Sequence, residues 1–383
     1  MLHDVRTQII LDGQALQQEW GGADQPYLNV RVSSEEGSGD PGPPAYVSMK
    51  AVYTDRDLFL LVQWTDPTEN NAKDAMYYMG PDSIYKLPHD PRGCVPALKS
   101  EFYWMRNPEQ DEDRVSIAFL IDTTSTGNPL SDFGTRGCLM ACHGGETPVF
   151  GRVESGYLDV WEWLASRTNP VRDLYTRRDD PGSPRYGVCG YLEDLYADAI
   201  GGLQPDPGTS SFWPNFDEGS NVPLWVYRRA DDTLIDPTNP NLRNEWGEKA
   251  RKNNGLSIAY LWREDPDLEV SHFSECDTMN EAPLPLGTPN HTWTTGDRAP
   301  GYILTYPRGS RADIHATGLF NAGVWTLEIG RLLATSDAIH DVTFAPAPER
   351  KYIFTVAVMD NSGRVHRGSQ PQILVFDPKG RAR

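Results

Sequence analysis

The 383 residues carry a formal net charge of −19, which excludes nucleic acid as a partner because nucleic-acid affinity comes mainly from neutralising phosphates with Lys and Arg. No run of about 18 apolar residues occurs, so the sequence predicts no transmembrane segment. The 34 Gly and 31 Pro residues favour turns over helix interiors, and they predict a core wrapped in many loops.

Short strands separated by turns are predicted along the first half of the chain. The clearest pair is a hairpin in which residues 46–53 alternate in polarity, Asp55-Arg56-Asp57 turns, and residues 58–64 continue as a buried strand. Residues 113–122 and 157–167 form two further strands. The second of these carries two tryptophans two residues apart, which point to the same face because side chains alternate along a strand.

Residues 170–299 lack sustained periodicity and are rich in Pro, Asp, Asn and Gly. This stretch is too long for a simple loop, so we expect an ordered, loop-rich insertion that packs on the same domain. Strand patterns return after residue 300. Many short strands spaced by turn residues predict an all-β fold, a β-sandwich built from residues 1–169 and 300–383.

The residues with the most distinctive chemistry are gathered in Cys138-Leu139-Met140-Ala141-Cys142-His143. Haem of the c type is attached by Cys-x-x-Cys-His, whose histidine ligates the iron. Here three residues separate the cysteines, so a disulfide, a metal site and structural cysteines remain alternatives to covalent haem. Among the other cysteines, Cys94, Cys189 and Cys276, we expect the last two to pair if the compartment is oxidising.

Several segments share their pattern and order with a known family: residues 64–68, the loop 137–143, the strand 159–163, and residues 325–331 followed by 354–361. Together they resemble the ethylbenzene-dehydrogenase-related haem-binding domain. That family includes the gamma subunits of type II DMSO-reductase-like molybdoenzymes and c-type cytochromes of similar fold. The resemblance covers residues 5–170 and 300–377.

This resemblance implies a β-sandwich similar to carbohydrate-binding modules, with one haem held at the end of its sheets. In the gamma subunits, a methionine before the Trp-rich strand and a lysine in the last hairpin hold the iron. Here the cysteine loop occupies the first region and His366 the second, which implies bis-histidine ligation with His143 proximal and His366 distal. Two imidazoles saturate the iron, and this suits electron transfer. Met76, Met79 and Met105 are alternative ligands.

No Ser/His/Asp order, phosphate loop or paired-carboxylate spacing occurs, so we expect an electron-transfer cytochrome or a subunit of an oxidoreductase complex, and not an enzyme. It would bind one haem covalently through Cys138 and Cys142 and act with other redox subunits or cytochromes in a larger assembly. Covalent haem is usually attached outside the cytoplasm. We therefore expect a periplasmic or extracellular location, although residues 1–6 show no signal peptide.

Two alternatives remain beside covalent haem. The first is a gamma subunit that binds haem b without covalent attachment. The second is a carbohydrate- or ligand-binding β-sandwich module in which the cysteines form a disulfide.

Overall fold

The computed structural model describes residues 9–20, 27–33, 45–71, 73–78, 104–106, 111–121, 133–134, 137, 157–169, 190–198, 201–214, 216, 225–227, 270–272, 298–299, 301–304, 307–362 and 366–376. The chain divides into two compact units. The first contains Met1–Glu69, Asp113–Ser211 and Pro307–Arg383, and the second contains Asn70–Glu112 and Phe212–Tyr306.

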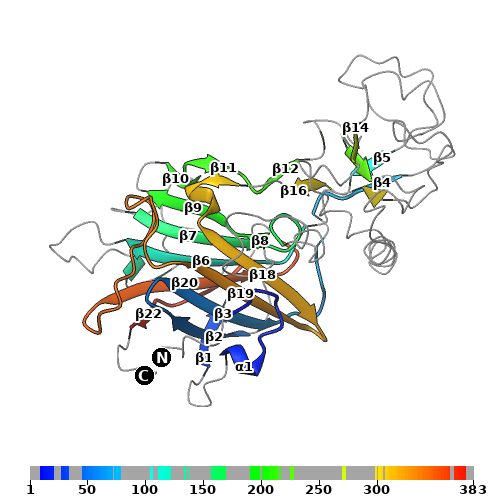
Figure 1. Ribbon diagram of the computed structural model, residues 1–383. Helices are drawn as coiled ribbons and strands as arrows, with labels where there is room; N and C mark the ends of the chain where they lie inside the picture. Colours follow the sequence, from blue (N-terminus) through cyan, green and yellow to red (C-terminus); the bar gives the residue numbers. More distant parts are fainter. Residues whose placement is uncertain are drawn as a thin grey trace, which may run out of the picture. The chain divides into compact units, whose positions relative to one another are not determined.

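The first unit is built on one 13-stranded sheet in which neighbouring strands are antiparallel (Figure 1). Across the sheet the strands follow the order β10 (Gly202–Pro205), β9 (Glu193–Asp198), β7 (Tyr157–Leu164), β6 (Arg114–Ile121), β20 (Lys351–Met359), β21 (Arg367–Ser369), β1 (Leu28–Ser33), β2 (Ala45–Tyr53), β3 (Asp57–Thr65), β19 (Val324–Leu332), β18 (Ile314–Asn321) and β8 (Gly190–Tyr191). β22 (Gln372–Val375) pairs with β20. The predicted all-β class is confirmed.

The sheet folds over so that its two halves face each other across one apolar core. Trp163 of β7 and Trp64 of β3 are far apart in the strand order, yet their ring centroids are 5.8 Å apart. Trp325 of β19 lies 4.9 Å from Trp163 and 6.0 Å from Trp64. Trp161 and Trp163 both point into this core, as their alternation predicts. The two facing halves form the predicted β-sandwich.

The predicted hairpin is formed by β2 and β3, whose turn is closed by Thr54. The Thr54 N–H donates to the Asp57 carbonyl at 2.8 Å, and the Asp57 N–H donates to Thr54 Oγ1 at 2.9 Å. Three short strands, β8 to β10, lie within residues 170–299, for which an insertion is predicted. They extend the core sheet through pairs with β18 and β7. The domain boundaries at residues 169 and 300 remain a prediction.

The described residues of the second unit form short strand pairs. These pairs are β4 (Met76–Tyr78) with β15 (Arg298–Ala299) and with β5 (Trp104–Arg106), β12 (Phe212–Pro214) with β16 (Tyr302–Leu304), and β13 (Trp225–Tyr227) with β14 (Val270–His272). A further pair, β11 (Gly208–Thr209) with β17 (Arg308–Gly309), belongs to the first unit. In the described part of the chain, no helix is long and apolar enough for a membrane crossing.

One buried carboxylate fixes the segment that contains α1 (Gln17–Trp20). Glu328 of β19 is 0% exposed. Its Oε2 accepts the N–H groups of Asp12 at 2.8 Å and Gly13 at 2.6 Å, and its Oε1 accepts Trp20 Nε1–H at 2.6 Å. A buried carboxylate is tolerated where such donors replace the water that it has lost. The Glu328 side chain therefore ties residues 12–20 to β19.

We expect Glu328→Gln to lower the free energy of unfolding by about 2 kcal/mol, because the amide loses the charge and turns an NH₂ group towards N–H donors. Urea unfolding followed by tryptophan fluorescence measures the change. Glu349→Gln is the matched control because Glu349 is exposed. Equal stability of the two variants would contradict this account of Glu328.

Candidate functional site

The hairpin between β20 and β21 carries His366, the predicted distal ligand. β20 ends at Met359, and the partly buried His366 directly precedes β21. β21 is held on both sides, since Gly368 pairs with Ala357 of β20 and Ser369 pairs with Val32 of β1. The sheet therefore fixes the position of the backbone that carries His366.

Gly137, the residue before Cys138, lies against the same hairpin. Its φ of +69° is a conformation that favours glycine. A Cβ placed on it would lie 2.9 Å from the Ser369 carbonyl oxygen and 3.1 Å from Pro371 Cδ. The Gly137 N–H donates to the carbonyl of Phe133 at 2.8 Å, and Phe133 is buried in a small apolar cluster on the sheet. The start of the cysteine loop and the His366 hairpin are thus neighbours.

The predicted ligands of the loop and the other cysteines lie outside the described residues: Cys138, Cys142, His143, Cys94, Cys189 and Cys276. Their predicted roles remain predictions. Among the alternative methionines, Met76 is a 0% exposed residue of β4 in the second unit. Met105 lies in β5, also in the second unit, and Met79 lies outside the described residues.

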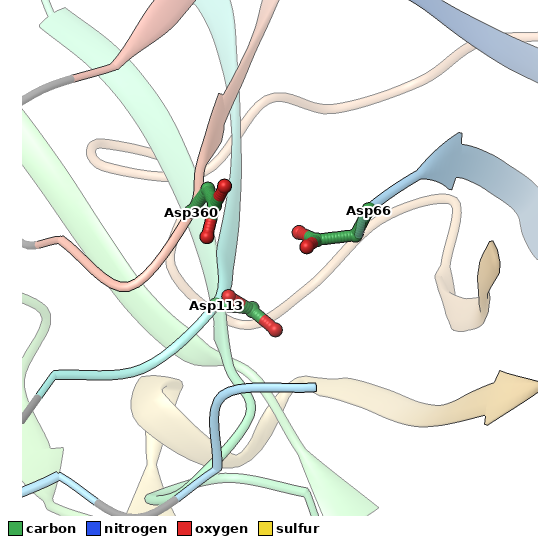
Figure 2. A group of neighbouring side chains, drawn as sticks. All are labelled: Asp66, Asp113 and Asp360. Atoms are coloured by element: carbon green, nitrogen blue, oxygen red, sulfur yellow. The ribbon is translucent and has the colours of Figure 1, made fainter. Parts of the chain in front are cut away.

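Three aspartates converge at the end of the sandwich from which this hairpin departs. Asp66 follows β3, Asp113 precedes β6 and Asp360 follows β20. Figure 2 shows the three side chains around one space, and one oxygen of each lies within 4.8 Å of the others. They are far apart in the chain, so no local pattern in the sequence could have grouped them.

N–H donors make hydrogen bonds to two of the three carboxylates. Asp113 accepts Trp325 Nε1–H at 3.0 Å and the Asn361 N–H at 3.1 Å. Asp66 accepts the Thr68 N–H at 3.1 Å. Burial nevertheless raises the pKa of Asp66 to about 6, because desolvation disfavours its charged form. The cluster connects the end of β3 and the start of β19 to the beginning of the hairpin that carries His366.

Gly137→Ala tests the close approach between the start of the loop and β21. The φ of +69° alone should cost about 1 kcal/mol, and the new Cβ would also press on the Ser369 carbonyl. Gly323→Ala is the matched control, because Gly323 has a φ of +80° but its Cβ would meet only the Asp66 carbonyl oxygen, at 3.5 Å. We expect Gly137→Ala to lower the free energy of unfolding by about 1 kcal/mol more than the control. Equal losses in urea unfolding would rule out the close approach.

The pH dependence of stability tests the surroundings of Asp66. A carboxyl whose pKa is raised on folding binds its proton more tightly in the folded state, so its contribution to stability is lost as the pH rises from about 4 to about 6. Asp66→Asn should therefore lose less stability than the native chain across this window. Asp55→Asn, in the exposed turn between β2 and β3, is the control and should follow the native profile. Parallel profiles for all three proteins would show that Asp66 is not perturbed.

The sequence was compared with curated proteins and with models of protein families. No curated protein matches it. The family model described as ethylbenzene dehydrogenase matches residues 25–370. This confirms the resemblance seen in the sequence.

The match also overturns one expectation. The chain was expected not to be an enzyme, but a dehydrogenase family is an enzyme family. The expectation failed because redox enzymes take their reactive chemistry from cofactors, so the lack of a nucleophile or acid–base motif excludes nothing. The matched residues cover most of the sequence, and the chain belongs to the ethylbenzene dehydrogenase family.

Proposed function

We propose that this chain is the haem-binding, electron-carrying part of an oxidoreductase of the ethylbenzene dehydrogenase type. One haem would be attached through Cys138 and Cys142, with His143 and His366 as its axial ligands. The observation that carries the proposal is the contact between Gly137 and β21, because it brings the two chain segments that bear the ligands to one place.

Simple chain geometry supports this assignment. His366 lies three residues before Ser369, or about 10 Å away in an extended strand. His143 lies six residues after Gly137, and six residues span at most about 20 Å. Both histidines can therefore reach a common centre beside β21. A haem between the loop and the hairpin would be within reach of both side chains.

The ligand types suit electron transfer. A bound haem supplies reversible one-electron chemistry, tuned by its axial ligands, its burial and nearby charge. Two imidazoles would saturate the iron, so the haem itself would pass electrons and would not bind substrate. The pairing of β21 with β20 and β1 would hold His366 in a fixed orientation, and covalent attachment would fix the other ligand.

The charge of the chain and the expected location complete the proposal. A net charge of −19 favours docking to a basic surface of another redox subunit or cytochrome. The assembly would act in the periplasm or outside the cell, where covalent haem is usually attached. The second candidate is non-covalent haem b, and its supporting observation is that three residues separate the cysteines where the standard c-type motif has two.

The described tryptophans do not favour the sugar-binding alternative, which would use exposed aromatic rings. Those whose side chains are described are at most 5% exposed: Trp20, Trp64, Trp161, Trp163 and Trp325. In this part of the chain the tryptophans instead build the core.

A visible spectrum tests the proposal, with His366→Ala as the decisive variant. The native protein should show a low-spin haem spectrum, and His366→Ala should convert it to a high-spin or mixed spectrum, since one axial position opens. His340→Ala is the control because His340 is engaged by Asp337 Oδ2 at 2.8 Å, and it should stay low-spin. Absence of a Soret band from the native protein would exclude haem. An unchanged low-spin spectrum in His366→Ala would exclude His366 as the ligand.

A further inference from the structure

A second group of carboxylates lies inside the first unit, next to Arg331, at the end of β19 opposite Trp325. Asp159 of β7, Asp194 of β9 and Asp341 each place an oxygen within 4.8 Å of the others. Their exposed fractions are 0%, 0% and 1%. The three carboxylates are therefore gathered in a space from which water is largely excluded.

A fourth carboxylate, Asp206, adjoins these three. Ser310 Oγ lies 3.1 Å from Asp206 Oδ2 and 3.3 Å from Asp341 Oδ2, so one hydroxyl bridges the two side chains. Asp206 follows β10 and is 2% exposed. The group thus draws on β7, β9, the end of β10 and the segment that follows β19.

Several of these buried oxygens make no hydrogen bond among the described residues. They are both oxygens of Asp194, Oδ1 of Asp206 and Oδ1 of Asp341. A buried carboxylate without a partner is strongly disfavoured, and such groups are normally paired or bound to a metal. This differs from Asp113 in the other cluster, whose two oxygens accept Trp325 Nε1–H and the Asn361 N–H.

The nearby guanidinium of Arg331 does not supply a partner for these buried carboxylate oxygens. Arg331 Nη1 lies 2.8 Å from Asp159 Oδ2, and its Nη2 donates to the Val342 carbonyl at 2.9 Å. Asp159 Oδ1 accepts Trp161 Nε1–H at 2.5 Å. The arginine is thus directed to Asp159, and no ion pair among the described residues joins it to Asp194, Asp206 or Asp341. A divalent cation would supply these carboxylates with the positive partner that the arginine does not provide.

We propose that Asp159, Asp194, Asp206 and Asp341 bind a calcium ion. Calcium takes about six to eight oxygen ligands at about 2.3–2.6 Å, so oxygens on opposite sides of the ion are about 4.8 Å apart. Mg²⁺ keeps several of its waters and demands octahedral geometry, which suits a site of almost fully buried carboxylates poorly. The ion would join the paired strands β7 and β9 to the segment that follows β19. This proposal does not depend on haem binding.

Thermal unfolding of the whole chain, first dialysed against EDTA, tests the assignment. Calcium at about 100 times its dissociation constant should raise Tm by roughly 5–10 °C, and the same concentration of Mg²⁺ should raise it much less. Elemental analysis of the calcium-loaded protein should find about one ion per chain after gel filtration. No calcium shift, or an equal shift with Mg²⁺, would overturn the proposal.

Two asparagine variants locate the ion. Asp194→Asn should abolish the calcium shift, and in EDTA its Tm should not fall below that of the native chain, because it removes an uncompensated buried charge. Asp360→Asn, in the cluster of Figure 2, should keep the full shift. Loss of the shift in Asp360→Asn and its retention in Asp194→Asn would place the ion in the other cluster and refute the assignment.

Terbium luminescence keeps the proposal testable if Asp194→Asn does not fold. Tb³⁺ replaces Ca²⁺ in oxygen sites and emits when a tryptophan close to it is excited. Trp161 is such a tryptophan, because its Nε1–H donates a hydrogen bond to Asp159. Excitation of tryptophan in the native chain should give terbium emission. Added Ca²⁺ should abolish this emission by displacing Tb³⁺, and added Mg²⁺ should leave it unchanged. Absence of sensitised emission would count against the site.

Discussion

The ion pair between Asp159 and Arg331 joins the two halves of the folded sheet. Asp159 lies on β7 and Arg331 on β19, and these strands belong to opposite halves. Both side chains are 0% exposed, with 2.8 Å between Arg331 Nη1 and Asp159 Oδ2. Removing one partner of such a pair typically costs about 3–5 kcal/mol, because the other charge is left buried alone. The pair therefore fixes how β7 faces β19.

That alignment has consequences at the other end of the same two strands. With Asp159 opposite Arg331, Trp163 of β7 meets Trp325 of β19. Trp325 then donates to Asp113, which also accepts the N–H of Asn361 at the start of the last hairpin. The hairpin continues into β21, the strand through which the two halves of the sheet are hydrogen-bonded. A continuous series of contacts therefore connects the buried ion pair to the backbone that carries His366.

The strands could be predicted from the sequence because their signal is local. Residues 46–64 alternate in polarity around a turn, and Trp161 and Trp163 share a face simply because they are two residues apart. Asp159 and Arg331 are separated by 172 residues, so no periodic pattern in the sequence could predict their contact. The segments that resemble the family contain both residues, but the resemblance did not show the contact. β8 to β10 were missed because they lie in a stretch rich in Pro, Asp, Asn and Gly that shows no sustained alternation.

The same distinction applies to the candidate site. The cysteine loop was recognisable because its two cysteines and its histidine are close together in sequence, and His366 was predicted only through the resemblance. The four buried aspartates were not found at all, since each one by itself is an ordinary polar residue of a strand or loop.

In the proposed site, one haem is held covalently at Cys138 and Cys142, beside the hairpin that carries His366. Mass spectrometry of the denatured chain tests this attachment. We expect a mass that exceeds that of the sequence by one haem, with the addition on the peptide that contains Cys138 to His143. A chain with the mass of the sequence alone would contradict covalent attachment.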